Sequence, residues 1–301
     1  MIAKKRLEPS ELLYYKMLDR RKSLPQQLKQ QYANLAKGYQ GESTFDSMTE
    51  ELSNGLILND LCLQANRSTF QIDALMIFQD EIHLFEIKNF DGDYVYHADK
   101  FYKRPKSEIV NPIHQLGRTE ALLRQALNSL RCNLPIHSSV VFINPQFTMY
   151  QTPLDKPFIF PGQIKKHLAK LQAIPSQVTN KHKELAKQLI SMHVSDSHFR
   201  KLSYLSEDRI KKGIICSQCF AFFEKAGKKY LTCDRCHHKE TVDQAVVRAI
   251  NEYSYLFPNE KVTTNKIYNW CEIIFYKRIK TVLTDHYKQV GERRWAHYVR
   301  R

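Results

Sequence analysis

The sequence lacks several features that define common protein classes. No apolar run approaches the roughly 20 residues that a membrane-spanning helix needs. The basic start at residues 1–6 is not followed by the apolar stretch of a signal peptide. With nine glycines, the chain also has no P-loop and no dinucleotide-binding fingerprint. We therefore expect a soluble, cytoplasmic protein with no membrane partner.

Cysteine is sparse and unevenly placed. Of the seven cysteines, four form two C-x-x-C pairs, and Cys62, Cys132 and Cys271 lie singly in apolar surroundings. Secreted proteins held by disulfides usually carry an even, dense set. The pattern favours a reducing compartment and one metal site.

Positive charge is concentrated towards the two ends of the chain. The whole chain carries a net +15, yet residues 38–155 hold nine Lys and Arg against 15 Asp and Glu. Residues 156–301 hold 28 against 13. A segregated basic block attracts polyanions through phosphate contacts and counterion release. This distribution favours nucleic acid as the partner, and a solvated, solubilising surface is the alternative.

The apolar pattern predicts a mixed α/β protein. Residues 10–37 indicate one or two amphipathic helices, and Gly38–Gly41 is expected to break the pattern before a helix that ends near Leu52. The later elements are expected as strands at Leu56–Gln64, Phe70–Phe78, Glu81–Lys88 and Tyr94–Phe101, a helix from Asn111-Pro112 to Leu130, and a strand at Ser138–Ile143. The order is helix, three or four strands, helix, strand.

Composition divides the chain into five expected segments. Three prolines and a glycine between residues 151 and 162 mark the end of the first domain. The segments are N-terminal helices at 1–37, an α/β core at 38–150, a helical linker region at 151–212, a cysteine hairpin at 213–240 and a basic, mostly helical module at 241–301.

The acidic middle block contains a pattern typical of metal chemistry. In the strand Glu86-Ile87-Lys88, alternation puts Glu86 and Lys88 on one face. If the preceding hairpin turns at Gln79-Asp80, Asp73 lies directly opposite Glu86, with the two Cβ atoms about 5 Å apart. Two carboxylates so close repel each other and need a cation. A hard divalent ion such as Mg²⁺ suits carboxylate ligands and phosphate chemistry. The alternative is an ordinary polar face of a hairpin.

Four motifs in order carry a family resemblance. Gly41-Glu42 on a helix, Gln71-Ile72-Asp73 and Glu86-Ile87-Lys88 on consecutive strands, and Asn111-Pro112 with Gln115 on a helix occur with characteristic spacing. Together they resemble the nuclease-related domain, a family of the PD-(D/E)XK nuclease-like superfamily. The resemblance covers roughly residues 35–150 and implies a restriction-endonuclease-like αβββαβ core. Ile72 replaces the proline of the superfamily's Pro-Asp pair, which is a mild departure.

The resemblance also implies roles for individual side chains. Asp73 and Glu86 would bind Mg²⁺ or Mn²⁺, and Lys88 would be the catalytic lysine. Glu42 would complete or support the metal site, and Gln115 would be an auxiliary polar group near the phosphate. Gln71 is a weaker candidate for the site.

The two C-x-x-C pairs predict a zinc site. Cys216 and Cys219 are separated from Cys233 and Cys236 by 13 residues, a spacing that lets a hairpin bring four thiolates to one tetrahedral ion. The motif resembles a zinc ribbon, and its closed set of ligands predicts a structural ion. A redox pair and an iron–sulfur cluster are the alternatives, and His237 or His238 are substitute ligands.

Basic and aromatic residues alternate around the cysteines. Such residues bind and stack on nucleic acid, or the aromatic ones form the small core of the ribbon. The residues are Lys225, Lys228, Lys229, Arg235 and Lys239, with Phe220, Phe222, Phe223 and Tyr230.

The C-terminal segment has the pattern of a small DNA-binding module. Thr263-Thr264 is expected to cap a helix, and a second helix is expected from Arg278 to His286. A glycine then precedes the basic pair Arg293-Arg294. The pattern fits a helix-turn-helix or winged-helix element with a basic tail, and it equally fits a generic helical bundle.

The sequence thus favours a Mg²⁺-dependent nuclease that cleaves DNA rather than RNA and grips it with the zinc ribbon and the C-terminal module. Two alternatives remain at this stage. One is a nucleic-acid-binding protein without turnover on the same fold, and the other is an adaptor whose ribbon docks proteins.

Overall fold

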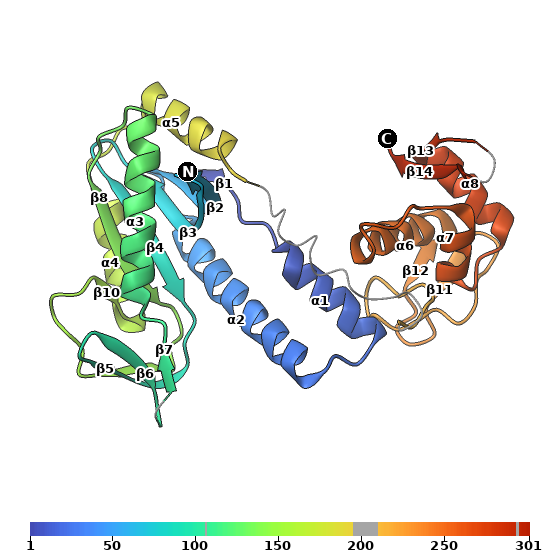
Figure 1. Cartoon of the computed structure of the whole chain (residues 1–301), viewed down its shortest axis with the longest axis horizontal. Helices are drawn as coiled ribbons and strands as arrows, with labels where there is room; N and C mark the ends of the chain where they lie inside the picture. The colour runs from blue at the N-terminus through green and yellow to red at the C-terminus, as the bar shows by residue number, and fades with distance from the viewer. Residues whose placement is uncertain (106, 195–209, 293–294) are drawn as a thin grey trace. The chain divides into compact units, whose positions relative to one another are not determined.

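The computed structural model describes residues 1–105, 107–194, 210–292 and 295–301 (Figure 1). The chain divides into two compact units. The first unit comprises Met1–Pro9 and Ala33–Asp196, and the second comprises Ser10–Tyr32 and Ser197–Arg301. Among the helices described, none has the length and apolarity needed to cross a membrane.

A six-stranded mixed sheet forms the centre of the first unit, in the order β1-β2-β3-β4-β8-β10. Strands β2, β3 and β4 are antiparallel neighbours, whereas β8 runs parallel to β4 because helix α3 (Pro112–Ser129) lies between them in the chain. The strands are β1 (Ile2–Lys4), β2 (Leu56–Ala65), β3 (Ser68–Ile77), β4 (Ile82–Lys88), β8 (Ile136–Phe142) and β10 (Phe158–Ile159).

Helices cover both faces of this sheet. One apolar cluster joins alternate residues of β2, β3 and β4, such as Leu75, to Leu123 of α3 and Leu189 of α5 (Asn180–Ser191). The other joins the opposite residues, such as Met76, to Phe45 of α2 (Gln26–Thr49) and to α4 (Ile164–Gln172). Figure 1 shows α3 running along one face of the strands. The unit is therefore a three-layered structure, and its mixed α/β class is the one that the sequence predicts.

A second, smaller sheet flanks the first, in the order β7-β6-β5-β9. Its strands are β5 (Gly92–His97), β6 (Lys100–Lys103), β7 (Ser107–Ile109) and β9 (Phe147–Tyr150). The single strand predicted at Tyr94–Phe101 is thus wrong, because Ala98 and Asp99 adopt positive φ and turn the chain into a hairpin. The other predicted strands and the helix before β8 occur in the predicted order.

Helix α2 continues through Gly38–Gly41, where the sequence analysis expects a break. Gly41 is needed for close approach instead: a Cβ at this position would lie 2.5 Å from Asn89 Cβ and 3.1 Å from Ile143 Cγ2. The helix can therefore lie against the end of β4 only because residue 41 has no side chain.

The region after the core is helical in two pieces. Helices α4 and α5 occupy most of residues 163–192, and residues 173–179, which include Pro175, separate them. Residues 195–209 of the predicted linker region, and the predicted basic pair Arg293-Arg294, lie outside the described residues.

The second unit has a core of helices. It also has a short β-hairpin and a preceding loop, which together carry the four cysteines. Trp270, Tyr253 and Ile279 are among its buried residues. Its elements are α1 (Ser10–Arg21), β11 (Tyr230–Thr232), β12 (Lys239–Thr241), α6 (Val242–Leu256), α7 (Thr264–Cys271), α8 (Tyr276–His286), β13 (Tyr287–Val290) and β14 (His297–Arg300). The predicted cap is confirmed, because the Thr263 side chain accepts the N–H of Lys266.

A buried ion pair fixes α1 within this unit. Arg21, whose side chain is fully buried, donates to both carboxylate oxygens of Glu252 at 2.8 and 2.7 Å. Its other donors reach the carbonyl oxygens of Lys211 and Gly213, and its guanidinium lies 4.0 Å from the centre of the Trp270 ring. All three nitrogens of the guanidinium therefore have acceptors, which a buried charge requires.

Candidate active site

An open cavity of about 510 Å³ lies in the first unit, where β3 and β4 separate. Glu42, Gln71, Asp73, Glu86, Lys88 and Gln115 all line it. These are the six core positions that the sequence analysis singles out. Four elements supply them, because Glu42 lies on α2, Asp73 on β3, Glu86 on β4 and Gln115 on α3.

The expected register of the β3–β4 hairpin is confirmed. Ile77 pairs with Ile82 and Ala74 with Phe85, a register that puts Asp73 opposite Glu86. Regular pairing ends at Ala74, and the Asp73 Oδ2 atom accepts the backbone N–H of Ile87 at 2.7 Å. The side chain thus replaces a main-chain acceptor, and this anchors the Asp73 carboxylate at the point where the two strands diverge.

Glu86 and Lys88 share one face of β4, and Phe85 and Ile87 point the other way into the core. The Lys88 Nζ atom lies 2.7 Å from Glu86 Oε1 and donates to Gln115 Oε1 at 2.9 Å. Glu86 is 3% exposed. Gln115 reaches this point because Asn111 caps α3 by accepting the N–H of Ile113, with Pro112 in the first turn.

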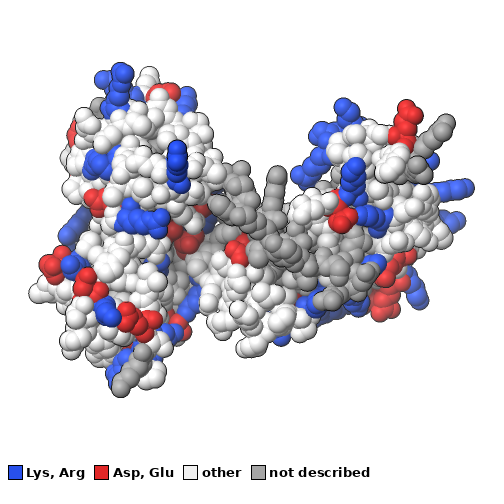
Figure 2. Space-filling model, viewed as in Figure 1, with Lys and Arg blue, Asp and Glu red and all other residues white. Residues whose placement is uncertain are grey.

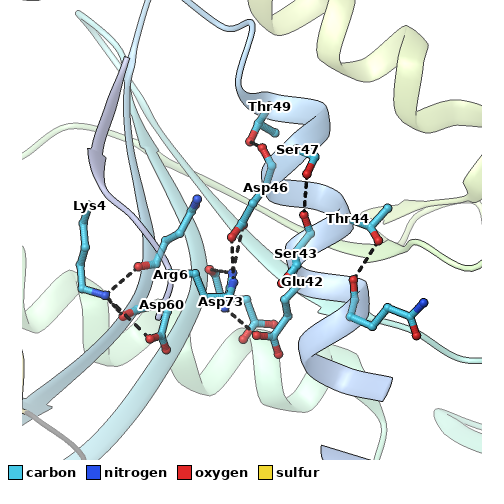
Figure 3. Close-up of polar contacts among 12 residues, drawn as sticks. Lys4, Arg6, Glu42, Ser43, Thr44, Asp46, Ser47, Thr49, Asp60 and Asp73 are labelled. Atoms are coloured by element: carbon cyan, nitrogen blue, oxygen red, sulfur yellow. Dashed lines mark hydrogen bonds and ion pairs between the residues drawn. The ribbon is translucent and has the colours of Figure 1, made fainter. Parts of the chain in front are cut away.

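Glu42 is held by an arginine from the N-terminal segment (Figure 3). Arg6, whose side chain is 3% exposed, donates through Nη1 to Glu42 Oε2 at 2.5 Å and through Nε to Asp46 Oδ2 at 2.9 Å. Its Nη2 atom donates to the backbone carbonyl of Asp73 at 2.7 Å. One guanidinium therefore ties α2 to β3 behind the cavity. Arg6 is not among the site residues predicted from the sequence, because no local pattern marks it.

The carboxyl groups of the cavity hold protons more tightly than usual. Burial, and then the nearby Asp73 charge, raises the pKa of Glu42 and that of Glu86 each to about 7. Burial also raises the pKa of Asp73, against the lowering effect of the Ile87 N–H. Arg6 and Lys88 lower these values without cancelling the rise. The site as it stands has a deficit of positive charge.

The six side chains that line the cavity do not all converge on one point. Gln71 is exposed, and its amide donates to Asp60 at 3.0 Å at the margin of the cavity. Within the described residues, only the four cysteines bring three or more potential ligand atoms within 4.8 Å of one another. The three carboxylates line one cavity but do not converge to that separation.

The four predicted cysteines do form one cluster. The sulfur atoms of Cys216, Cys219, Cys233 and Cys236 all lie within 4.8 Å of one another. The Cys216–Cys236 distance is 3.7 Å and the Cys219–Cys233 distance is 3.4 Å. A tetrahedral ion with Zn–S bonds of about 2.3 Å separates its sulfurs by about 3.8 Å. The cluster therefore has dimensions that fit a metal such as zinc.

The two halves of the cluster have the same backbone geometry. Cys216 accepts the N–H of Phe220, and Cys233 accepts the N–H of His237. Phe220 and His237 both adopt positive φ, at 61° and 57°. Each pair of cysteines therefore sits on a tight turn closed by the residue after its second cysteine. His237 and His238 are outside the set of four ligands.

The aromatic residues around the cysteines differ in burial. Phe223 is buried and belongs to the core, whereas Phe220 and Tyr230 are 44% and 46% exposed. Arg20 lies 3.4 Å above the Phe220 ring, and Lys239 lies 4.3 Å above that of Tyr230. The exposed rings thus make cation–π contacts with side chains of the protein and do not form a ribbon core.

A family model matches the part of the chain that carries this cavity. The model of the nuclease-related domain family matches residues 37–143, so the resemblance seen in the sequence is confirmed for that segment. No curated protein matches the chain significantly. Among solved structures, the crystal structure of protein VC1899 from Vibrio cholerae is 12% identical, with a TM-score of 0.26. That match covers 47% of this chain and 33% of VC1899. The chain thus contains a nuclease-related domain and, after it, a zinc-ribbon-like cysteine cluster.

Proposed function

We propose that the chain is a divalent-metal-dependent nuclease that hydrolyses phosphodiester bonds in DNA at the cavity between α2, β3, β4 and α3. The observation that supports this most is the grouping of Asp73, Glu86 and Lys88 at the point where two strands part. A carboxylate pair with a neighbouring lysine, on the wall of an open cavity, suits a metal ion and a phosphate together.

The charge balance of the cavity supports a cation there. Two glutamates with a pKa near 7 and a buried aspartate share the cavity with Lys88, and Arg6 lies behind it. The other two lysines of the lining, Lys37 and Lys103, pair with Asp91 instead. Oxygen ligands of this kind fit Mg²⁺ or Mn²⁺. Asp73 and Glu86 would hold the ion, and Glu42 would support it, since Arg6 already binds one of its oxygens.

A bound Mg²⁺ would lower the pKa of a water ligand and stabilise the charge that develops on the phosphate oxygens. Lys88 would donate to the attacking water or to a phosphate oxygen. Its Nζ atom is already held between Glu86 and Gln115, so little reorientation is needed. Gln115 would keep Lys88 directed into the cavity and would offer its own amide to the phosphate.

The zinc-binding segment and the C-terminal module would hold the substrate. The excess of Lys and Arg in residues 213–301 and the cation-contacting rings beside the cysteines suit a phosphate backbone. Zinc in the four-cysteine cluster would be structural, because four thiolates leave no open position for a substrate.

Cleavage of supercoiled plasmid tests the proposal. Zinc-loaded protein is incubated with Mg²⁺ or Mn²⁺, or without either ion, so that the zinc site stays filled in every arm. Lys88→Ala is compared with Lys100→Ala, which removes the same charge from an exposed lysine paired with Glu108 in the same unit. We expect metal-dependent nicking that Lys88→Ala abolishes and Lys100→Ala leaves unchanged.

Equal cleavage by both lysine variants would contradict the assigned site. If the protein only shifts the plasmid, and also leaves RNA and single-stranded or branched DNA intact, then the domain binds without turnover.

A further inference from the structure

The C-terminal part of the second unit has the topology of a winged helix. Helices α6, α7 and α8 pack around a core that includes Ile250, Trp270 and Leu283. Strands β13 and β14 then form an antiparallel hairpin. Val262, which precedes α7, pairs antiparallel with Tyr298 of β14 and accepts its N–H at 2.8 Å. The order is therefore helix, a single bridged residue, helix, helix and hairpin.

Hydrogen bonds attach the hairpin to the helices. Tyr287 at the start of β13 and Arg300 at the end of β14 both donate to Asn251 Oδ1 of α6, each at 3.2 Å. The ring of Tyr298 and that of Tyr287 are buried against the helices. The hairpin thus has a fixed place beside α8 and is not a loose tail.

Helices α7 and α8 are joined by a turn of four residues, 272–275, in which Glu272 adopts a φ of 55°. Ile279, Val282 and Leu283 of α8 are buried, which leaves the opposite face exposed. That face carries Lys277 and Lys280, followed by Thr281 and Thr284 one turn on. Both threonine hydroxyls donate to carbonyls one turn back, those of Lys277 and Lys280, so their oxygens are left to accept from base edges, and the two lysines suit phosphates.

The positive charge on this face is available for a ligand. Arg278, on the flank of α8, pairs with Asp243 at 2.6 Å, and Lys266 pairs with Glu260. By contrast, Lys277, Lys280 and Lys288 make no ion pair with any residue that the structure describes. Figure 2 shows Lys and Arg side chains over the part of this unit that carries α8 and the hairpin. The one acidic residue of α8, Asp285, lies on the flank next to Arg278 in helical projection.

We infer that α6–α8 with the β13–β14 hairpin bind double-stranded DNA, with the exposed face of α8 in the major groove and the hairpin against the adjoining backbone. The 11 residues of α8 give a rod about 16 Å long, and the major groove of B-DNA, about 12 Å wide, admits a helix. The deep, narrow major groove of double-stranded RNA does not. The inference rests on the proposed function only in treating the bound DNA as the substrate, because the binding itself needs no cleavage.

Binding is measured with the zinc-loaded Lys88→Ala protein in the absence of Mg²⁺, so that no duplex is cut. Fluorescence anisotropy compares a 20-base-pair DNA, the RNA duplex of the same sequence and one DNA strand at several salt concentrations. In this background, Lys277→Ala/Lys280→Ala is compared with Lys165→Ala/Lys166→Ala, which removes two exposed lysines from α4 in the other unit.

We expect the DNA duplex to bind more tightly than the RNA duplex. The α8 variant should lose about tenfold or more in affinity, and the slope of log K against log salt should fall in magnitude by about 2. The α4 variant should change neither. Thermal melting checks that both variants are folded. In a second measurement, bound protein should protect guanine N7, a major-groove atom, from methylation by dimethyl sulfate.

The inference is overturned if the RNA duplex binds equally well, if the α8 variant keeps full affinity, if guanine N7 stays reactive, or if the DNA duplex does not bind. Loss of affinity in the α8 variant with no cleavage by the wild type would sink the proposed function alone. Metal-dependent cleavage with an unaffected α8 variant would sink this inference alone.

Discussion

The carboxylate of Asp73 accepts the backbone N–H of Ile87 at 2.7 Å, at the point where β3 and β4 cease to pair. This bond holds the carboxylate toward Glu86, whose pKa is raised by burial and then by the Asp73 charge. The geometry of the strand end therefore creates an unfavourable pair of carboxyl groups.

Replacing Asp73 with Asn should lower the pKa of both glutamates in the metal-free protein. The amide keeps an oxygen for the Ile87 N–H but removes the charge that disfavours ionisation of Glu42 and Glu86. The fall should be partial, because burial is the larger cause. Carbon-13 NMR titration of the glutamate carboxyl groups measures it, with Asp80→Asn at the exposed hairpin turn as the control. Unchanged pKa values would show that Asp73 does not act on these groups.

The stability of the metal-free protein should fall as the pH rises from 6 to 8. Glu42 and Glu86 have a folded pKa of about 7, above their ordinary value near 4.5, so the folded state binds more protons between these values. The free energy of unfolding therefore decreases with rising pH, by about 1 kcal/mol per glutamate in this window. Denaturant unfolding at pH 6 and 8 measures it.

The contribution of one glutamate is isolated by Glu86→Gln, which should flatten this pH dependence relative to the wild type. Added Mg²⁺ should stabilise the wild type more at pH 8 than at pH 6, since ionised carboxylates bind it. A pH dependence that is identical in Glu86→Gln would rule out this origin.

The second unit should depend on the four-cysteine cluster for its fold. Cys219→Ser should reduce bound zinc well below one ion per chain and melt the loops that Cys216 and Cys233 close. Cys132→Ser, at a half-buried cysteine outside the cluster, should leave the zinc content unchanged. Elemental analysis and limited proteolysis check both variants. Full zinc retention in Cys219→Ser would contradict the ligand set.

Alanine substitutions at two glycines of α2 should change the stability of the protein in opposite directions. Gly38→Ala adds a methyl group with nothing within 4 Å and should stabilise α2 by about 0.5–1 kcal/mol. Gly41→Ala puts Cβ 2.5 Å from Asn89 Cβ, so α2 must shift and carry Glu42 with it. We expect a loss of about 1–3 kcal/mol in stability and a marked fall in cleavage. Equal thermal melts for the two variants would show that α2 does not need the close approach.

Arg21→Met should destabilise the second unit by about 3–5 kcal/mol, because it leaves Glu252 buried without its partner. The double variant Arg21→Met/Glu252→Leu removes both charges and should recover much of this loss. Urea unfolding followed by Trp fluorescence reports on the unit, since Trp270 contacts Arg21. A double variant as unstable as the single one would mean that packing around Arg21, rather than its charge, dominates.

Local patterns in the sequence determined a large part of this protein. The spacing of Cys216, Cys219, Cys233 and Cys236 predicted the metal cluster, because the ligands lie in two short turns. Alternation along β3 and β4 predicted the register that puts Asp73 opposite Glu86, because the turn at Gln79-Asp80 fixes the hairpin. The cap at Thr263 and the start of α3 at Pro112 follow from the same local rules.

Only the tertiary structure decided the contacts between distant segments. Arg6 reaches Glu42 across 36 residues, and Arg21 reaches Glu252 across 231, and neither pair has a local signal. The sequence predicts that Gly41 breaks the helix, whereas the structure shows that it lets the end of β4 approach the helix closely. The bridge from Val262 to Tyr298, which joins the segment before α7 to β14, has no local signal either. The periodicity of apolar residues indicates which face of a helix or strand is buried. The packing of the whole chain determines which element covers that face.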